Sequence, residues 1–207
     1  MGSEIQTTET KKKGNTRLNN ILDRKQNFID HFMRELNKCR LNPAAYADVV
    51  EKHIAHIKPN EDPNSKNAAF YVREGMPKIS LSKGESAFRD FAQKLREMQP
   101  MKKLEFRSNL QIPIPETPTE WTSKEYIATS VNTCKNELKS TSNYKSFNFH
   151  FDVGSPLSEN SFVLQLVDDT PFKGSRSRNI LNSNFSYVGI SSQKLKNKHC
   201  GYFLFAN

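Results

Sequence analysis

The 207-residue sequence lacks any run of about 18 consecutive apolar residues, so it contains no candidate for a membrane-spanning helix. Residues 1–14 also lack the apolar core of a secretory signal, and we expect no such signal there. Cysteine is scarce and widely spaced, at Cys39, Cys134 and Cys200. This odd, scattered set favours neither a disulfide framework nor a metal knuckle, and it is typical of a protein in the reducing cytoplasm.

Acidic residues are absent from a long stretch of the chain, residues 170–207. The same stretch holds six basic residues: Lys173, Arg176, Arg178, Lys194, Lys196 and Lys198. A second basic run lies in the polar segment 1–17, at Lys11, Lys12 and Lys13, and the whole chain has a formal net charge of +9. These residues predict a basic surface that binds an acidic protein partner, although a solvated basic face without a ligand explains the charge equally well.

Apolar residues are spaced as in one packed domain. Only 35% of the residues are hydrophobic, but they include 14 Phe and 6 Tyr, which can build a core. Helical periodicity predicts helices in the first two thirds of the chain, and strands follow from residue 147 with helices between them. This order predicts an α/β fold in three α-β-α layers over residues 18–207, with an N-terminal helical extension, preceded by a basic polar tail at 1–17.

Two local patterns give more detailed expectations. Residues 147–153 alternate between phenylalanine and polar side chains, which predicts a central strand that buries Phe147, Phe149 and Phe151 and leaves His150 and Asp152 on a polar face. Ser82 and Glu85 have the spacing of a capping box, which predicts the start of a helix. Asp168 and Asp169 follow a predicted helix, where capping and pairing with Arg176 or Arg178 is the simplest interpretation.

The segment from Asp168 to Ile190 contains Arg178-Asn-Ile-Leu-Asn182 and Val188-Gly189, and the chain continues to a final Gly201-Tyr-Phe-Leu-Phe-Ala206 strand. It resembles the C-terminal motif of the CAP superfamily, also called SCP, the family of cysteine-rich secretory and pathogenesis-related proteins. The segment Asn37-Lys-Cys-Arg40-Leu-Asn42-Pro43-Ala-Ala-Tyr46-Ala47 is similar to the N-terminal motif of the protist branch. The resemblance covers about residues 25–206 and implies a CAP-like sandwich.

The sequence departs from the family at the cavity. Intact CAP domains carry two histidines and two acidic residues that can hold a divalent metal. Counting along the motifs places the corresponding positions at Phe149, next to His150, and at Ser175 or Arg176. Arginine has no lone pair for a metal at any accessible pH. The resemblance therefore implies a degenerate cavity, and we expect no metal, no cofactor and no catalytic residues.

The preferred hypothesis is a non-catalytic, cytoplasmic CAP-like module that is a fixed subunit of a larger assembly, with the tubulin wall of a cilium as one candidate partner. The alternative is a lipid- or sterol-binding CAP protein. A third hypothesis is a hydrolase that uses His150 oriented by Asp152, although no serine or cysteine nucleophile can be assigned to it. Nucleic-acid binding has weak support, because no zinc-finger, RNP or helix-turn-helix pattern occurs.

Overall fold

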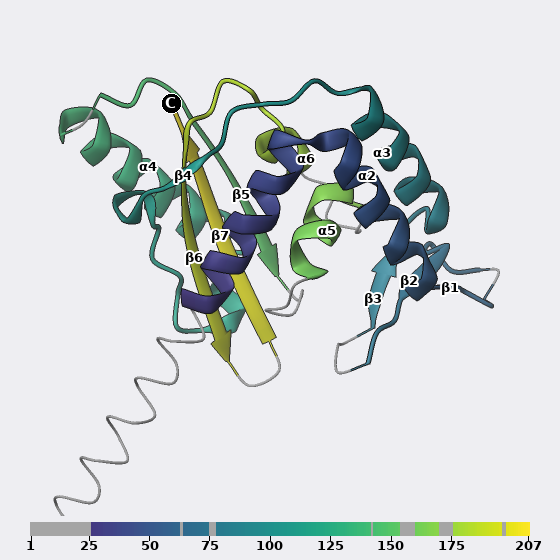
Figure 1. Cartoon of the computed structure of the whole chain (residues 1–207). Helices are drawn as coiled ribbons and strands as arrows, with labels where there is room; N and C mark the ends of the chain where they lie inside the picture. The colour runs from purple at the N-terminus through teal and green to yellow at the C-terminus, as the bar shows by residue number, and fades with distance from the viewer. Residues whose placement is uncertain are drawn as a thin grey trace, which may run out of the picture.

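The computed structural model describes residues 26–62, 64–74, 78–141, 143–153, 160–169, 176–195 and 198–207. Helices and two sheets alternate along these ranges, which confirms the α/β class (Figure 1). The helices are residues 26–41, α2 (Pro43–Lys52), α3 (Glu85–Glu97), α4 (Lys124–Thr141), α5 (Asn160–Val167) and α6 (Arg176–Ile180), with short 3₁₀ turns η1 (His53–His56), η2 (Ser108–Leu110) and η3 (Pro118–Glu120). Residues 1–25, including Lys11, Lys12 and Lys13, lie outside the described part.

The larger sheet has the strand order β4-β6-β7-β5. Its strands are β4 (Glu105–Phe106), β5 (Phe147–Val153), β6 (Tyr187–Leu195) and β7 (Lys198–Ala206). Strand β7 runs antiparallel to both β5 and β6, whereas β4 runs parallel to β6. Alternate residues of β7 enter different cores, with Phe203 and Phe205 on one face and Tyr202 and Leu204 on the other. The period of two along β7 thus covers both faces of the sheet.

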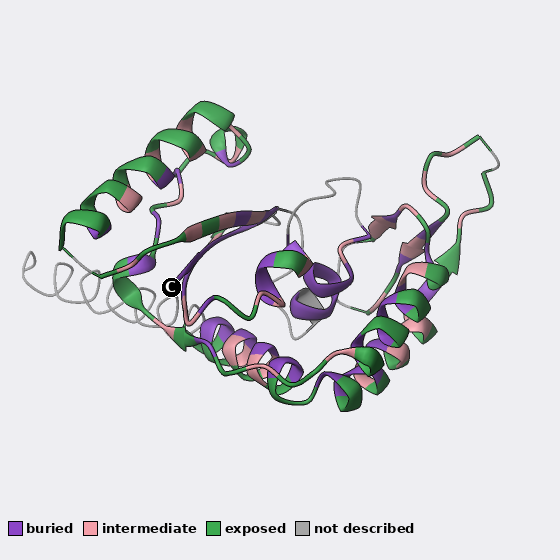
Figure 2. Ribbon diagram, turned by 90° about the horizontal axis from the view of Figure 1, so that it is seen from above, coloured by how far each residue is buried: buried purple, intermediate pink, exposed green. Residues whose placement is uncertain are grey.

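Helices cover both faces of this sheet. Figure 2 shows α4 on one side and residues 26–41, α5 and α6 on the other, which gives a helix–sheet–helix arrangement. Phe32 of the first helix joins the layers, because its ring lies 4.9 Å from that of Phe203 and 5.2 Å from that of Phe162 in α5. On the opposite face, Trp121 is fully buried beside Val131 and Leu138 of α4.

A smaller antiparallel sheet lies next to α2 and α3 in Figure 1. It consists of β1 (Ile57–Pro59), β2 (Ala69–Tyr71) and β3 (Ile79–Leu81). Helix α2 begins at a cap that the local sequence supplies: the Asn42 side chain accepts a hydrogen bond from the Ala45 N–H at 3.1 Å, and Pro43 occupies the first helical position. None of the described helices is both long enough and apolar enough to cross a membrane.

Strand β5 forms over the predicted residues, but its predicted position and faces were wrong. It is the last strand of the described sheet and not a central one. His150 and Asp152 are buried, with 5% and 2% of their surface exposed, whereas Phe147, Phe149 and Phe151 are only half-buried. The physical reason is that helices cover both faces, so the polar side chains find partners on α5 and α6 while the phenylalanines face α4.

Arg40 connects the first helix to the segment after α6. Its side chain is fully buried and donates hydrogen bonds to backbone carbonyl groups of four residues: Lys102 at 2.8 Å, Ile180 at 2.7 Å, Asn182 at 3.0 Å and Phe185 at 3.4 Å. Burial lowers the pKa of this guanidinium to about 10, so the group remains charged at neutral pH. The two sequence segments on which the CAP resemblance depends are therefore in direct contact.

Candidate functional site

Two of the predicted cavity positions come together in a buried polar cluster between β5, α5 and α6. His150 lies on β5 and Arg176 on α6, and both are at least 95% buried. Gln165 of α5 and Asn179 of α6 complete the cluster, and each of these residues is 1% exposed. Phe149 is on the opposite face of β5, so it does not take part. Ser175 lies outside the described residues.

Carboxamide groups orient the imidazole of His150. Its Nε2 lies 3.3 Å from Gln165 Oε1, and its Nδ1 lies 3.4 Å from Asn179 Nδ2. The ring also packs 4.7 Å from the ring of Phe203. Burial, together with the positive charge of Arg176, lowers the pKa of His150 to about 3. At neutral pH the ring is therefore neutral.

Arg176 is a buried ion-pair residue and not part of a basic surface, which corrects the sequence prediction. Its guanidinium lies 3.4 Å from Asp152 Oδ1 and 3.3 Å from Asp168 Oδ1, and its Nε donates to the Phe151 carbonyl at 3.1 Å. The contact with Asp168 confirms the predicted pairing of this aspartate. The Phe151 contact satisfies a backbone acceptor of β5, the last described strand of the sheet.

Asp169 fixes the start of α3, where the sequence predicted a Ser82–Glu85 capping box. The Asp169 carboxylate accepts hydrogen bonds from the backbone N–H groups of Lys83 and Gly84, each at 2.9 Å. Gly84 is the N-cap residue and has a φ of 68°, and no side chain of its own helix makes a capping hydrogen bond. The predicted capping box is therefore wrong, because a carboxylate from another part of the chain occupies its place.

This cluster has the properties of a structural network. A hydrolytic dyad requires a carboxylate on the imidazole and a nucleophile on its other nitrogen, but here both ring nitrogens face carboxamides. Among the described residues, no group of three or more His, Cys, Asp or Glu side chains could hold a metal ion. All three cysteines are free thiols, and burial raises the pKa of Cys39 and Cys200 to about 12.

The depressed pKa of His150 predicts destabilisation in acid. Its native pKa of about 3 lies below the reference value of 6.5, so the unfolded chain binds the proton first. The stability that the neutral His150 ring contributes is therefore fully present above about pH 6.5 and declines toward pH 3. The slope from this group is up to about 1.4 kcal/mol per pH unit. Urea unfolding at several pH values should show a shallower decline in His150→Gln than in the parent protein.

His53 contributes to the pH dependence of stability over the same range and serves as a comparison for His150. Burial lowers its pKa to about 4, and its Nδ1 lies 2.8 Å from the Tyr71 hydroxyl in another part of the fold. His53→Gln should therefore remove a separate share of the acid dependence, and the two shares should add because the sites are independent. An unchanged slope in His150→Gln would contradict the assignment.

The described residues include only part of the predicted basic surface. Arg178 and Lys194 are exposed, as expected. Lys173 and Lys196 lie outside the described residues, and so does the side chain of Lys198. With Arg176 buried, the described surface offers little support for a site in this region.

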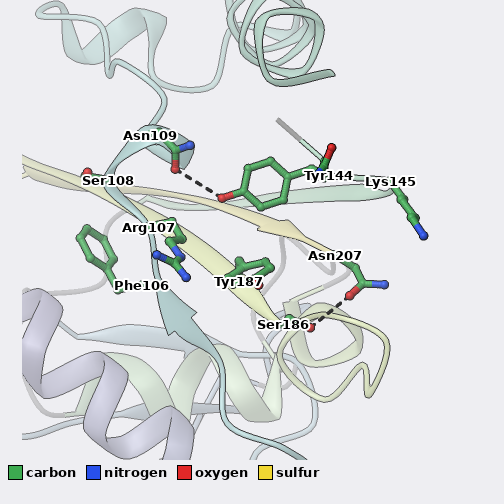
Figure 3. A pocket seen from close by; sticks show the side chains of 10 residues that line it. Phe106, Arg107, Ser108, Asn109, Tyr144, Lys145, Ser186, Tyr187 and Asn207 are labelled. Atoms are coloured by element: carbon green, nitrogen blue, oxygen red, sulfur yellow. Dashed lines mark hydrogen bonds between the residues drawn. The ribbon is translucent and has the colours of Figure 1, made fainter. Parts of the chain in front are cut away.

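The structure instead contains an open cleft that the sequence did not predict (Figure 3). This Arg107 cleft has a volume of about 720 Å³ and is lined by Phe106, Arg107, Ser108, Asn109, Asn143, Tyr144, Lys145, Ser186, Tyr187 and Asn207. These residues come from β4 and the turn after it, the segment before β5, the start of β6 and the end of β7. Four parts of the chain therefore meet in one concave site of the size that ligand pockets usually have.

Aromatic rings and cations form the cleft together. The Arg107 guanidinium lies 5.0 Å from the centre of the Tyr187 ring, and the Tyr144 ring meets Tyr187 edge-to-face at 5.4 Å. The Tyr144 hydroxyl donates to Asn109 Oδ1 at 3.5 Å, and the Ser186 hydroxyl donates to Asn207 Oδ1 at 3.1 Å (Figure 3). These contacts hold the aromatic wall in place.

The cleft is electropositive. None of its described lining residues is an aspartate or glutamate. Two of them, Arg107 and Lys145, are exposed cations. Glu105 pairs with Arg107 at 2.7 Å, but Lys145 makes no ion pair with any described residue. Lys102 adds a third cation at the rim, where its Nζ donates to the Ser186 hydroxyl at 2.8 Å. The arrangement suits an anionic ligand with planar or amide groups.

No protein-family model matches the chain, and no curated protein or solved structure does. The CAP resemblance therefore stays a prediction.

Proposed function

We propose that this chain is a non-catalytic protein-binding module that holds an acidic segment of a partner protein in the Arg107 cleft. The observation that carries the proposal is the lining of the cleft, in which cations, aromatic rings and amides occur without an acidic side chain among the described residues. Carboxylates of the partner pair with Arg107 and Lys145, and its backbone amides pair with Asn109, Asn143 and Asn207. As in the sequence hypothesis, the module is a fixed cytoplasmic subunit of a larger assembly.

A peptide fits this cleft better than a nucleic acid does. The rings of Tyr144 and Tyr187 pack against each other and Arg107 lies over the Tyr187 ring, so these aromatic residues form a wall and not a row of open stacking platforms. Amide and hydroxyl groups suit the alternating donors and acceptors of a peptide backbone.

The polar cluster supports a binding role and not a catalytic one. His150 is neutral, buried and held by Gln165 and Asn179, so it has neither the exposure nor the partner of a general base. Arg176 is committed to Asp152 and Asp168. In our proposal this cluster fixes α5 and α6 against β5.

Charge reversal in the Arg107 cleft tests the proposal. The double variant Arg107→Glu/Lys145→Glu should bind a fluorescein-labelled oligoglutamate peptide at least about tenfold more weakly than the parent, because two attractive contacts become repulsive. Fluorescence anisotropy at low and high ionic strength measures this, and parent binding should weaken with salt.

The matched control is Lys52→Glu/Lys94→Glu, which changes the net charge equally on the exposed surfaces of α2 and α3. This variant should keep most of the parent affinity. Equal losses in the two double variants would show a nonspecific charge effect and would reject the cleft. Tighter binding of a fluorescein-labelled oligothymidylate than of oligoglutamate, lost in Arg107→Glu/Lys145→Glu, would assign the cleft to nucleic acid instead.

A further inference from the structure

The Arg107 cleft lies at the β4 edge of the larger sheet. Among the described residues, strand β4 is the first strand of that sheet. The N–H groups of Glu105 and Arg107 donate toward β6, to the carbonyls of Ser186 at 2.9 Å and Val188 at 3.0 Å. Because neighbouring residues of a strand point their backbone groups in opposite directions, the N–H and C=O of Phe106 point away from β6. They provide one donor and one acceptor for an additional strand.

One position along this edge already has a hydrogen-bonding partner within the protein. The Asn37 side chain of the first helix accepts from the Leu104 N–H at 2.8 Å and donates to the Leu104 carbonyl at 3.0 Å. Leu104 precedes Phe106 by two residues, so its backbone groups point to the same side of the strand. The carboxamide of Asn37 thus pairs with the edge as a strand would, and the next pairing position along the edge is Phe106.

A second hollow lies on the other side of β4. This Met33 hollow has a volume of about 490 Å³, and Phe106 lines both it and the Arg107 cleft. Its apolar lining is Ile29, Met33, Leu41 and Phe106, and its polar lining is Asp30, Arg34, Asn37, Lys38 and Lys103, which is three cations against one carboxylate. Leu41 is 44% exposed and is one of two large hydrophobic side chains exposed among the described residues; the other is Val72.

We infer that the partner segment adds as a strand along β4, with alternate side chains acidic and apolar. In an added strand, successive side chains point to opposite faces of the sheet. Acidic side chains then enter the Arg107 cleft, and apolar side chains enter the Met33 hollow, while the backbone pairs with Phe106. Because three cations outnumber the one carboxylate in its lining, the Met33 hollow is also net positive and favours an acidic segment. This inference rests on the proposed function and specifies the sequence pattern of its partner.

Three fluorescein-labelled peptides test the inference by fluorescence anisotropy. The first alternates Glu and Val, the second has the same composition with all Glu before all Val, and the third is the alternating peptide with N-methyl groups on every second backbone nitrogen. The alternating peptide should bind at least about tenfold more tightly than either of the others, because only it combines both side-chain sites with a pairing backbone. Equal binding of the alternating and block peptides would overturn strand addition.

Two protein variants make the test independent of the peptides. Leu41→Ser should weaken the alternating peptide but leave oligoglutamate binding nearly unchanged, because it removes an apolar contact in the Met33 hollow without adding a charge. The matched control is Val72→Ser, which alters the other exposed hydrophobic side chain, next to the smaller sheet, and should affect neither peptide. Equal effects of both variants on the alternating peptide would overturn the inference. If oligoglutamate binds and depends on Arg107 and Lys145, the proposed function stands even then; if neither peptide binds, the proposed function itself fails.

Discussion

Replacing Arg40 with alanine is expected to lower the free energy of unfolding by about 3–5 kcal/mol. The guanidinium is fully buried and binds carbonyl groups before β4 and after α6. Its removal leaves the buried carbonyls of Ile180 and Phe185 without this donor, and it also leaves a cavity. Urea unfolding followed by circular dichroism measures the loss.

Two further variants isolate the cause. Arg34→Ala on the same helix removes a guanidinium whose side chain is 56% exposed and paired with Glu35, and it should change stability by no more than about 0.5 kcal/mol. Arg40→Lys keeps the charge but should remain clearly destabilised, because a single ammonium cannot reach carbonyls in several directions. A loss below about 1 kcal/mol in Arg40→Ala would show that the carbonyls find other donors.

The sequence patterns predicted elements well where local periodicity decides the structure. Helices form with the predicted apolar stripes, as Phe32, Leu36 and Cys39 of the first helix show. The final strand, expected at residues 201–206, also forms, but β7 already begins at Lys198, where it pairs with Leu195 of β6. Two-residue periodicity indicates a strand but does not give its ends.

Expectations that depended on distant residues were less successful. In β5, alternation separated the two sets of side chains but assigned the buried face wrongly, because it could not tell that the His150 face would meet Gln165 and Asn179 while helix α4 lay over the phenylalanines. At α3, the Ser82–Glu85 spacing gave a local cap, but Asp169 from the end of α5 supplies the carboxylate. In both places a partner more than ten residues away along the chain overrides the local preference.

The Arg107 cleft could not be predicted from local sequence patterns either. Its residues come from four separate segments, and each segment is unremarkable by itself: a short strand, a polar turn, a strand start and a strand end. Net charge of +9 indicated an anionic partner, but the charge pattern pointed to residues 170–207 because that region lacks acidic residues. What creates the electropositive site is the fold, which places Arg107 over Tyr187 and brings Lys145 into the same cleft.

Replacing Gly189 with alanine is expected to be nearly as damaging as the loss of Arg40, with a cost of about 3 kcal/mol. A Cβ atom at Gly189 would lie 2.3 Å from the backbone carbonyl carbon and oxygen of Leu110 and 2.5 Å from its Cβ. These are backbone atoms and a Cβ, so no side-chain rotation relieves the overlap, and either β6 or the η2 turn has to move. Leu110→Ala retains all three atoms and therefore cannot restore stability.

The displacement should also reach the Arg107 cleft. The η2 turn holds Ser108 and Asn109 in the cleft wall, and Arg107 immediately precedes it. If strand β6 and this turn separate, Arg107 loses its position over Tyr187, so Gly189→Ala should weaken oligoglutamate binding under conditions in which the protein is still folded. Ser191→Ala, two residues along on the same face of β6, is the matched control and should leave both stability and affinity nearly unchanged. Normal affinity in a destabilised Gly189→Ala would mean that the close approach supports the sheet alone and that the cleft wall is held by other contacts.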